Sequence, residues 1–177
     1  MQDTKNDISK MPTTPQTMLD RLNKESIKFD LYEHEALFTV EQSKHVDATI
    51  PAHHTRNMFL RTKKKQNFLI TLSHDTPIDL KKLAELLNVK NFSFGSTDRL
   101  MQILGVYPGS VTPLSAINAA PSDLQVILEE KMMRADKIAV HPLINTMTIT
   151  FNPNDLLQLY KSYNHTPIIL DLNSAAP

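Results

Sequence analysis

The run from Gly105 to Pro113 (Gly-Val-Tyr-Pro-Gly-Ser-Val-Thr-Pro) is the first segment of the sequence whose residue types suit chemistry. Glycine allows the chain to approach a ligand closely, and a fixed turn points backbone N–H groups at an anion or a developing oxyanion without reorganisation. The alternative is purely structural. Gly105 has the pattern of a helix C-cap, which we favour for that residue, and the segment from Gly109 onward fits a tight turn equally well.

A second polar cluster, His53-His54-Thr55-Arg56-Asn57, stands directly before the apolar run Met58-Phe59-Leu60. These side chains would gather at the entrance of a strand. The planar guanidinium of Arg56 suits a phosphate, and the amide of Asn57 suits a ribose or a carbonyl group. The alternative is a solvated loop, because loops are usually polar whether or not they bind anything.

A third candidate is His141, which follows an apolar strand-like segment and begins the run His-Pro-Leu-Ile-Asn. Such a histidine suits a binding pocket. The more common case is a ring whose nitrogen atoms bond to neighbouring backbone groups.

Several classes of site are excluded or disfavoured by what the sequence lacks. It has no cysteine, which rules out disulfides, thiolate zinc sites and cysteine nucleophiles. Its seven histidines show no spacing typical of a metal site, so we expect no metal. A glycine-rich phosphate loop, a nucleophile elbow and a dinucleotide-binding fingerprint are also absent, so we expect no cofactor.

The elements that must position these residues follow from hydrophobic spacing and capping signals. Predicted helices begin after Thr17, after the Thr39–Gln42 capping pair, after Asp79, after Ser96 and after Asn152-Pro153, and the fourth ends at Gly105. Predicted strands cover 29–32, 58–60, 68–72, 111–117, 124–128, 138–140 and 146–150, with a final buried strand at 167–170. Because helices and strands alternate irregularly, the fold class is α+β, a single domain whose mixed central sheet is flanked by helices.

The composition sets the boundaries of this domain and the kind of partner it can have. The 177 residues suit one core, with residues 1–14 as a flexible polar tail and 15–173 as the folded domain. Lys+Arg and Asp+Glu number 19 each, so any nucleic-acid contact must be local. The hairpin tip at 61–66, which carries Lys63, Lys64 and Lys65, is either such a contact or a solubilising charge cluster. No apolar run reaches the roughly 20 residues of a membrane span, so we expect a cytoplasmic protein without a membrane partner.

Taken together and in order, these segments resemble the YbaK/ProX editing-domain family, and most closely its free-standing prolyl-tRNA editing proteins. The resemblance covers most of the chain and is carried by the stretches 34–41, 54–60, 78–83, 92–96, 104–113, 117–118, 141–145 and 169–172. It implies hydrolysis, without a metal, of the ester that joins a mischarged amino acid to the terminal adenosine of tRNA. The substrate we expect is alanyl-tRNA(Pro), with the acceptor end of tRNA as partner and prolyl-tRNA synthetase as a further candidate partner.

The same resemblance assigns the site residues. It implies a reaction centre of Arg56, Asn57, Gly109 and His141, with substrate-binding residues His54, Thr55, Ser110, Val111, Thr112, Pro113 and Asn118.

One departure keeps other functions open. The family usually has lysine where this chain has Arg56, and an arginine cannot act as a base at neutral pH. Arg56 supports one alternative, a non-catalytic module that binds aminoacyl-tRNA or a synthetase. A further alternative is related editing of another substrate, such as cysteinyl- or seryl-tRNA. The sequence does not predict an oligomeric state.

Overall fold

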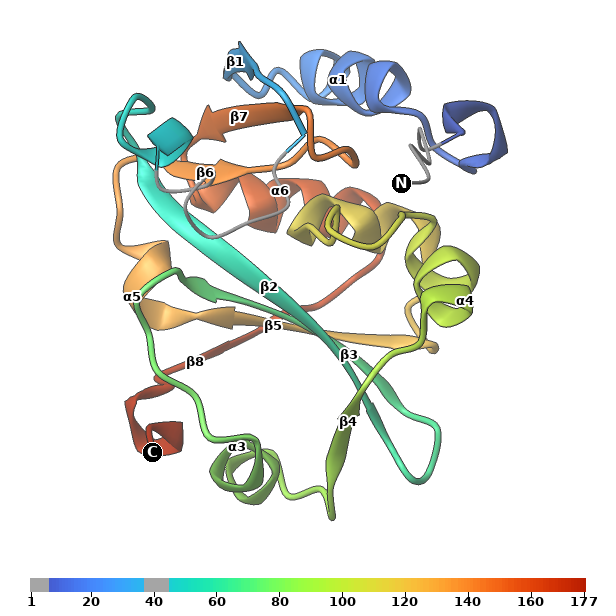
Figure 1. Ribbon diagram of the computed structural model, residues 1–177, viewed down its shortest axis with the longest axis vertical. Helices are drawn as coiled ribbons and strands as arrows, with labels where there is room; N and C mark the ends of the chain where they lie inside the picture. Colours follow the sequence, from blue (N-terminus) through green and yellow to red (C-terminus); the bar gives the residue numbers. More distant parts are fainter. Residues whose placement is uncertain (1–6, 37–44) are drawn as a thin grey trace.

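The computed structural model describes residues 7–36 and 45–177, and these residues form an eight-stranded mixed sheet (Figure 1). Its strands are β1 (Asp30–Glu33), β2 (His53–Thr62), β3 (Asn67–Ser73), β4 (Phe92–Phe94), β5 (Leu124–Glu129), β6 (Ile138–Val140), β7 (Met147–Phe151) and β8 (Ile168–Leu170). The spatial order is β1-β7-β6-β2-β3-β5-β8, and β4 also pairs with β2. The β2–β6, β3–β5 and β5–β8 pairs are parallel, and the others are antiparallel.

Strand β2 organises the sheet because its two ends have different neighbours. Its first residues pair with β6 and its last residues with β4, while β3 runs along its other edge. Side chains alternate between the two faces of a strand. Phe59 therefore joins one hydrophobic cluster, and Met58 and Leu60 join the other on the opposite face.

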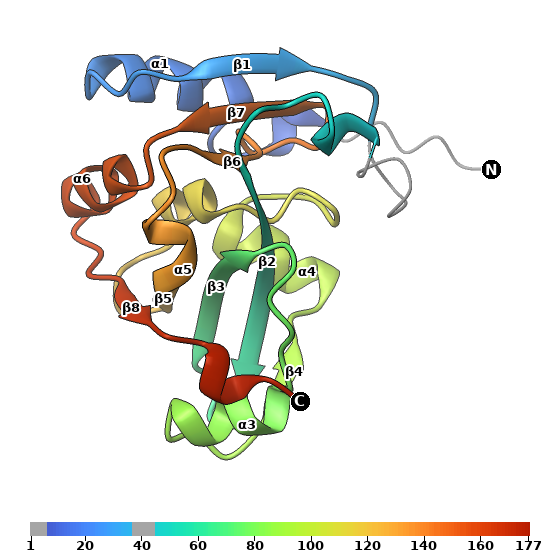
Figure 2. The same cartoon turned by 90° about the vertical axis from the view of Figure 1, so that its left-hand side faces the viewer.

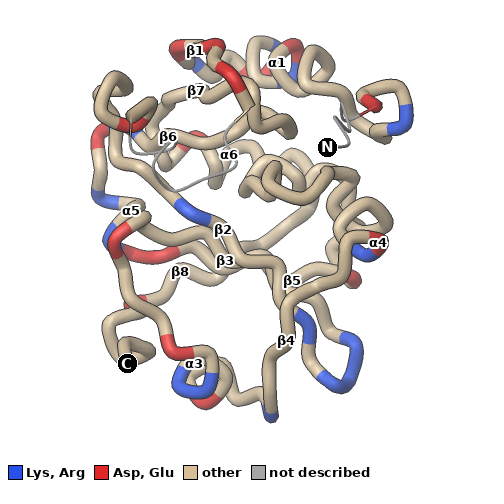
Figure 3. The backbone as a smooth tube through the Cα atoms, viewed as in Figure 1, with Lys and Arg blue, Asp and Glu red and all other residues tan. Residues whose placement is uncertain are grey.

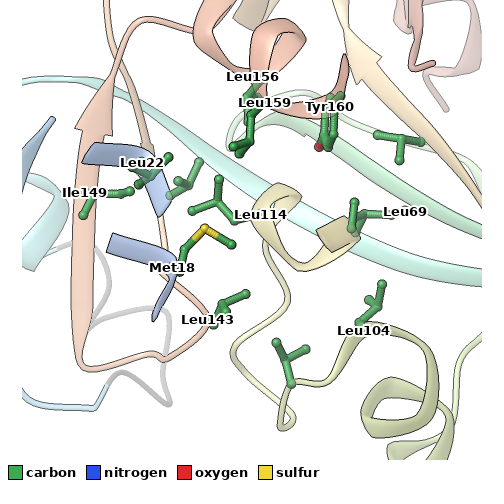
Figure 4. Packing of buried hydrophobic residues seen from close by; sticks show 14 of the residues in the cluster. Met18, Leu22, Leu69, Leu104, Leu114, Leu143, Ile149, Leu156, Leu159 and Tyr160 are labelled. Atoms are coloured by element: carbon green, nitrogen blue, oxygen red, sulfur yellow. The ribbon is translucent and has the colours of Figure 1, made fainter. Parts of the chain in front are cut away.

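The helical segments cover the two faces of the sheet unequally. They are η1 (Ile8–Lys10), α1 (Pro15–Lys24), α3 (Leu80–Leu86), α4 (Thr97–Arg99), η2 (Leu100–Leu104), η3 (Pro113–Asn118), α5 (Glu130–Met133), α6 (Asn154–Ser162) and η4 (Asn173–Ala175). The larger cluster packs α1, η2, η3 and α6 on one face, as Figure 4 shows for Met18, Leu104, Leu114 and Leu159. The smaller cluster packs α3 and η4 on the other face. Figure 2 shows α1 with β1 and β7 at one end of the molecule and α3 at the other.

Most local predictions are confirmed. Asp79 caps α3, Ser96 caps α4, and Gly105 ends η2 in the left-handed conformation with φ 63°. The predicted hairpin is β2–β3, and β5, β6 and β7 lie within a residue or two of their predicted positions. The α+β class with a mixed sheet flanked by helices is also confirmed.

Three local predictions were wrong. The first helix begins at Pro15 with Thr14 as its N-cap, so Thr17 lies inside it. The segment 111–117 is not a strand, because Pro113 has no N–H for a sheet ladder and instead begins the 3₁₀ helix η3. Strand β8 is at the edge of the sheet, with Ile168 and Ile169 40% and 43% exposed rather than buried.

Two other predicted segments need separate mention. The helix expected after Thr39 falls largely on residues 37–44, outside the described residues. Of residues 7–14, which belong to the predicted tail, Met11 is buried, and the carbonyl of Asp7 accepts a hydrogen bond from the hydroxyl of Tyr107 at 3.0 Å. Within residues 7–36 and 45–177, no helix has the length and apolar character needed to cross a bilayer.

Candidate active site

A cavity of about 340 Å³ opens where the start of β2 meets β6 and the loop that carries Gly109. Its lining includes predicted residues from three separate segments: His54, Thr55, Arg56, Asn57, Gly109, Val111 and His141. The register of β2 against β6, with His54 opposite Ala139, brings the polar start of β2 beside the end of β6, where His141 follows. The sheet thus joins clusters that are more than 80 residues apart in the sequence.

The glycine loop presents backbone donors at this cavity. A turn fixed by the hydrogen bond from Ser110 N to Tyr107 O, at 3.0 Å, places Gly109 at φ 84°, a conformation that favours glycine. Gly109 and Val111 line the cavity, and their N–H groups make no hydrogen bond within the described part of the chain. Unused N–H groups beside a cavity can bind an anionic oxygen.

His141 is held in one tautomer. Its Nδ1 lies 2.9 Å from the carbonyl oxygen of Met147, so Nδ1 carries the hydrogen and Nε2 keeps a lone pair when the ring is neutral. Desolvation by the surrounding protein is the largest effect and lowers the pKa of His141 below its usual 6.5. The hydrogen bond to Met147 and the charge of Asp47 oppose this shift in part, while the neighbouring His34 ring adds to it. The backbone contact expected of a structural histidine is therefore present, yet it leaves one neutral nitrogen as an acceptor at the cavity.

Asn57 and Thr55 occupy adjacent positions on the same face of β2. The Asn57 side-chain oxygen accepts a hydrogen bond from the Thr71 hydroxyl at 2.7 Å, which orients the amide and leaves its NH₂ group as a donor. The Thr55 hydroxyl donates to the carbonyl of Ala139 at 2.8 Å and ties β2 to β6. The Asn57 amide is thus oriented for binding, whereas the Thr55 side chain links β2 to β6.

His54 has both ring nitrogens occupied. Nδ1 lies 3.1 Å from a carboxylate oxygen of Asp47, and Nε2 lies 3.0 Å from the carbonyl of Ile50. His54 therefore fastens the segment 47–50 to the rim of the cavity.

Arg56 is anchored on one side. Its Nη2 donates to the carbonyl of Thr76 at 2.6 Å, whereas its buried Nε has no partner within the described residues. The Thr76 hydroxyl in turn donates to Glu129 Oε1 at 2.5 Å. The guanidinium is thus held at the cavity wall by a turn that a buried carboxylate supports.

Glu129 is the centre of this support. It is only 2% exposed, and its Oε2 accepts from both the backbone N–H and the hydroxyl of Ser73, at 2.6 and 2.5 Å. The Ser73 hydroxyl also lies 2.7 Å from Nε2 of His53. A continuous hydrogen-bond chain therefore leads from His53 at the start of β2 to the side chain of Thr76, the residue whose carbonyl holds Arg56.

Four predicted site residues do not line the cavity. Ser110 and Thr112 are fully buried, the carbonyl of Pro113 accepts the hydroxyl of the buried Tyr160 at 2.9 Å, and Asn118 bonds to Thr13 and to the carbonyl of Leu104. These contacts hold the loop against the protein interior. The structure therefore separates the two residues that face the cavity, Gly109 and Val111, from those that hold them.

The cavity also has lining residues that the sequence analysis did not single out: Asp47, His74, Ala139, Val140 and Thr148. Of these five residues, Asp47 is the one that the sequence could have suggested, because an aspartate can pair with a histidine. Among the described residues, no three His, Asp or Glu side chains are grouped so that they could hold a metal ion.

Comparison with known proteins is consistent with this arrangement. The model of the aminoacyl-tRNA editing domain matches residues 34–159, which include all the described residues of the cavity. This chain belongs to that family. The resemblance found in the sequence is confirmed.

Individual relatives agree with the family assignment. The "Prolyl-tRNA editing protein ProX" of Acetoanaerobium sticklandii is 29% identical over 152 residues, covering 85% of this chain and 93% of that protein. The mouse "Prolyl-tRNA synthetase associated domain-containing protein 1" is 32% identical over 158 residues, covering 86% and 93%. A solved structure, "Crystal structure of a putative trans-editing enzyme for prolyl tRNA synthetase", has the same fold, with a TM-score of 0.67 at 16% identity over 89% of this chain and 94% of that one.

Proposed function

We propose that this member of the editing family is a trans-editing deacylase that hydrolyses the ester of mischarged tRNA, with alanyl-tRNA(Pro) as its substrate. The observation that carries the proposal is the meeting of unused backbone N–H groups, a neutral histidine nitrogen and an oriented amide at one cavity. The family assignment and the name of the ProX relative support the same reaction.

In this proposal a water molecule attacks the ester carbonyl carbon. The negative charge that develops on the carbonyl oxygen is stabilised by the N–H groups of Gly109 and Val111, which need no reorganisation. The Nε2 atom of His141 accepts the proton of the attacking water and returns it to the ribose oxygen as the ester bond breaks. Asn57 holds the ribose or the ester carbonyl, and no side-chain nucleophile or metal is required.

Selection of the amino acid would come from the size of the cavity. The side chains of Val111, Ala139 and Val140 supply apolar wall beside its polar groups. A wall that excludes the larger proline ring by overlap discriminates strongly, whereas one methylene of hydrophobic contact gives only about 1–3 kcal/mol. Parallel assays with alanyl-, cysteinyl- and seryl-tRNA would show which small amino acid the cavity accepts.

A non-catalytic binding module is the second candidate, and Arg56 is the observation that favours it. The permanently charged guanidinium cannot exchange a proton with the substrate, and one edge of it is already bound to Thr76. We propose instead that Arg56 binds a phosphate near the tRNA terminus and positions the ester. Release of alanine from alanyl-tRNA(Pro) by the purified protein distinguishes a deacylase from a binding module.

We also propose that the protein works in the cytoplasm and associates with prolyl-tRNA synthetase. The second point is supported by the name of the mouse relative. Co-purification of the two proteins, with and without tRNA, would test it.

A further inference from the structure

The lysines of the β2–β3 hairpin form a hollow with the segment that follows α3. This hollow of about 280 Å³ is lined by three lysines, two side-chain amides and no carboxylate: Thr62, Lys63, Lys64, Gln66, Asn88, Val89 and Lys90. A larger hollow of about 770 Å³ adjoins it, since the two share Lys64, Gln66, Asn88 and Val89. We call Lys63, Lys64, Lys65 and Lys90 the lysine surface; Figure 3 shows its blue segments at the hairpin tip and just before β4.

The charges of the lysine surface are not neutralised within the protein. Some exposed cations elsewhere do have acidic partners, as in Lys131–Asp75 at 2.8 Å and Lys137–Asp30 at 2.6 Å. No ion pair formed by residues 7–36 and 45–177 includes a member of the lysine surface. Because the whole chain has no net charge, four unpaired lysines in one place are a local excess.

The hairpin tip is fixed rather than loose. Thr62 N donates to Gln66 O at 3.0 Å, Lys65 N donates to Thr62 O at 2.9 Å, and Gln66 N donates to the Thr62 hydroxyl at 3.2 Å. Lys65 has φ 66°, a left-handed conformation that costs a non-glycine residue on the order of 1 kcal/mol. These hydrogen bonds hold the three neighbouring lysines together at the tip of the hairpin.

We propose that the lysine surface binds the phosphate backbone of the tRNA acceptor stem while the 3′ end occupies the cavity at the start of β2. This inference rests on the proposed function and adds the protein surface that holds the body of the substrate. Lysines are mobile point charges, so they suit phosphates and would contact the stem without reading its sequence. Lys63 directly follows the last residue of β2 and is nine residues from His54, a separation of roughly 30 Å at about 3.3 Å per residue. That separation allows the stem to lie along the hairpin while its single-stranded end reaches the cavity.

The test compares two triple variants with the same change in net charge. The first is Lys63→Gln/Lys64→Gln/Lys65→Gln. The matched control is Lys24→Gln/Lys28→Gln/Lys161→Gln, which changes three exposed lysines that also lack an ion pair within the described residues. Fluorescence anisotropy with uncharged tRNA(Pro) over a series of salt concentrations gives the Kd and its salt dependence.

We expect the hairpin variant to raise the Kd about tenfold or more, and to reduce the log–log salt slope by roughly 2 to 3, since each lost phosphate contact removes roughly 0.7 to 0.9. Adding Lys90→Gln should weaken binding further. The control should bind like wild type. Equal Kd values and salt slopes for the hairpin variant and the control would overturn the proposal.

Deacylation separates this proposal from the proposed function. The hairpin variant should lose kcat/KM on alanyl-tRNA(Pro) by the factor seen in its Kd, yet hydrolyse a short alanyl-CCA oligonucleotide at the wild-type rate. An equal loss on the short substrate would refute a contact with the stem. If wild type hydrolyses neither substrate, the proposed function fails, and the anisotropy comparison still decides whether the lysine surface binds RNA.

Discussion

Replacement of Glu129 by glutamine should destabilise the fold far more than its one-atom change suggests. The carboxylate accepts three hydrogen bonds, from the backbone N–H and hydroxyl of Ser73 and from the hydroxyl of Thr76. A glutamine side chain keeps one oxygen, which must face the fixed backbone N–H of Ser73. Its NH₂ group then faces the Thr76 hydroxyl, which can no longer donate to it, and the bonds from Ser73 lose their charged acceptor.

The magnitude follows from the bonds lost. A hydrogen bond to a charged group contributes about 1.5–3 kcal/mol and one between neutral groups about 0.5–1.5 kcal/mol, so the three bonds together weaken by about 3 kcal/mol. Glu129 and its partners are almost inaccessible to water, so solvent cannot replace the lost bonds. We therefore expect Glu129→Gln to lower the free energy of unfolding by about 3 kcal/mol, and to loosen the Thr76 carbonyl that anchors Arg56.

Urea unfolding followed by circular dichroism measures this effect. At an m-value of about 2 kcal/mol/M the midpoint should fall by about 1.5 M with the slope unchanged. The control is Glu130→Gln, which removes a neighbouring charge whose partner Arg134 is on the surface and should cost less than about 1 kcal/mol. A midpoint for Glu129→Gln that matches the control would refute the structural role assigned to this carboxylate.

Three further predictions concern the site itself. Arg56→Ala should slow single-turnover deacylation about a hundredfold, since a lost charge-assisted contact is worth about 2–3 kcal/mol, whereas the rate of Arg56→Lys should stay near that of wild type. Equal rates for Arg56→Ala and wild type would show that Arg56 has no part in the reaction. Burial lowers the pKa of His141 in the folded state, so as the pH falls the unfolded chain protonates this ring before the folded chain does. The neutral ring therefore contributes to the free energy of unfolding above about pH 6.5, and this contribution is lost as the pH falls below that value. His141→Gln should thus flatten the decline of unfolding free energy on acidification by up to about 1.4 kcal/mol per pH unit, and parallel profiles would contradict this. Deacylation should survive exhaustive chelation; loss of activity that zinc restores would show a metal site.

The sequence predicted what local rules determine. Capping by Asp79 and Ser96, the left-handed Gly105 and the β2–β3 hairpin depend on residues a few positions apart, so their signals are visible in the chain. The segment 111–117 was misjudged because its β-branched residues favour a strand while Pro113 forbids the ladder.

The support of the site was not visible in the sequence. Glu129 follows an apolar strand and meets Ser73 and Thr76 from 56 and 53 residues away, and nothing near it in the chain indicates a buried carboxylate. The resemblance did identify residues that line the cavity, including Gly109 and His141, because they belong to stretches that match the family in the same order along the chain. It could not separate them from Thr112, Pro113 and Asn118, which share those stretches but bond to the protein interior.

We propose that the cavity between β2, β6 and the Gly109 loop hydrolyses an aminoacyl ester. The decisive experiment is single-turnover deacylation of alanyl-tRNA(Pro) by the purified wild-type protein, beside prolyl-tRNA(Pro) under the same conditions. We expect rapid release of alanine, with prolyl-tRNA left intact and with the rate strongly reduced in Arg56→Ala. Binding of alanyl-tRNA(Pro) without release of alanine above the spontaneous rate would contradict it and identify a binding module.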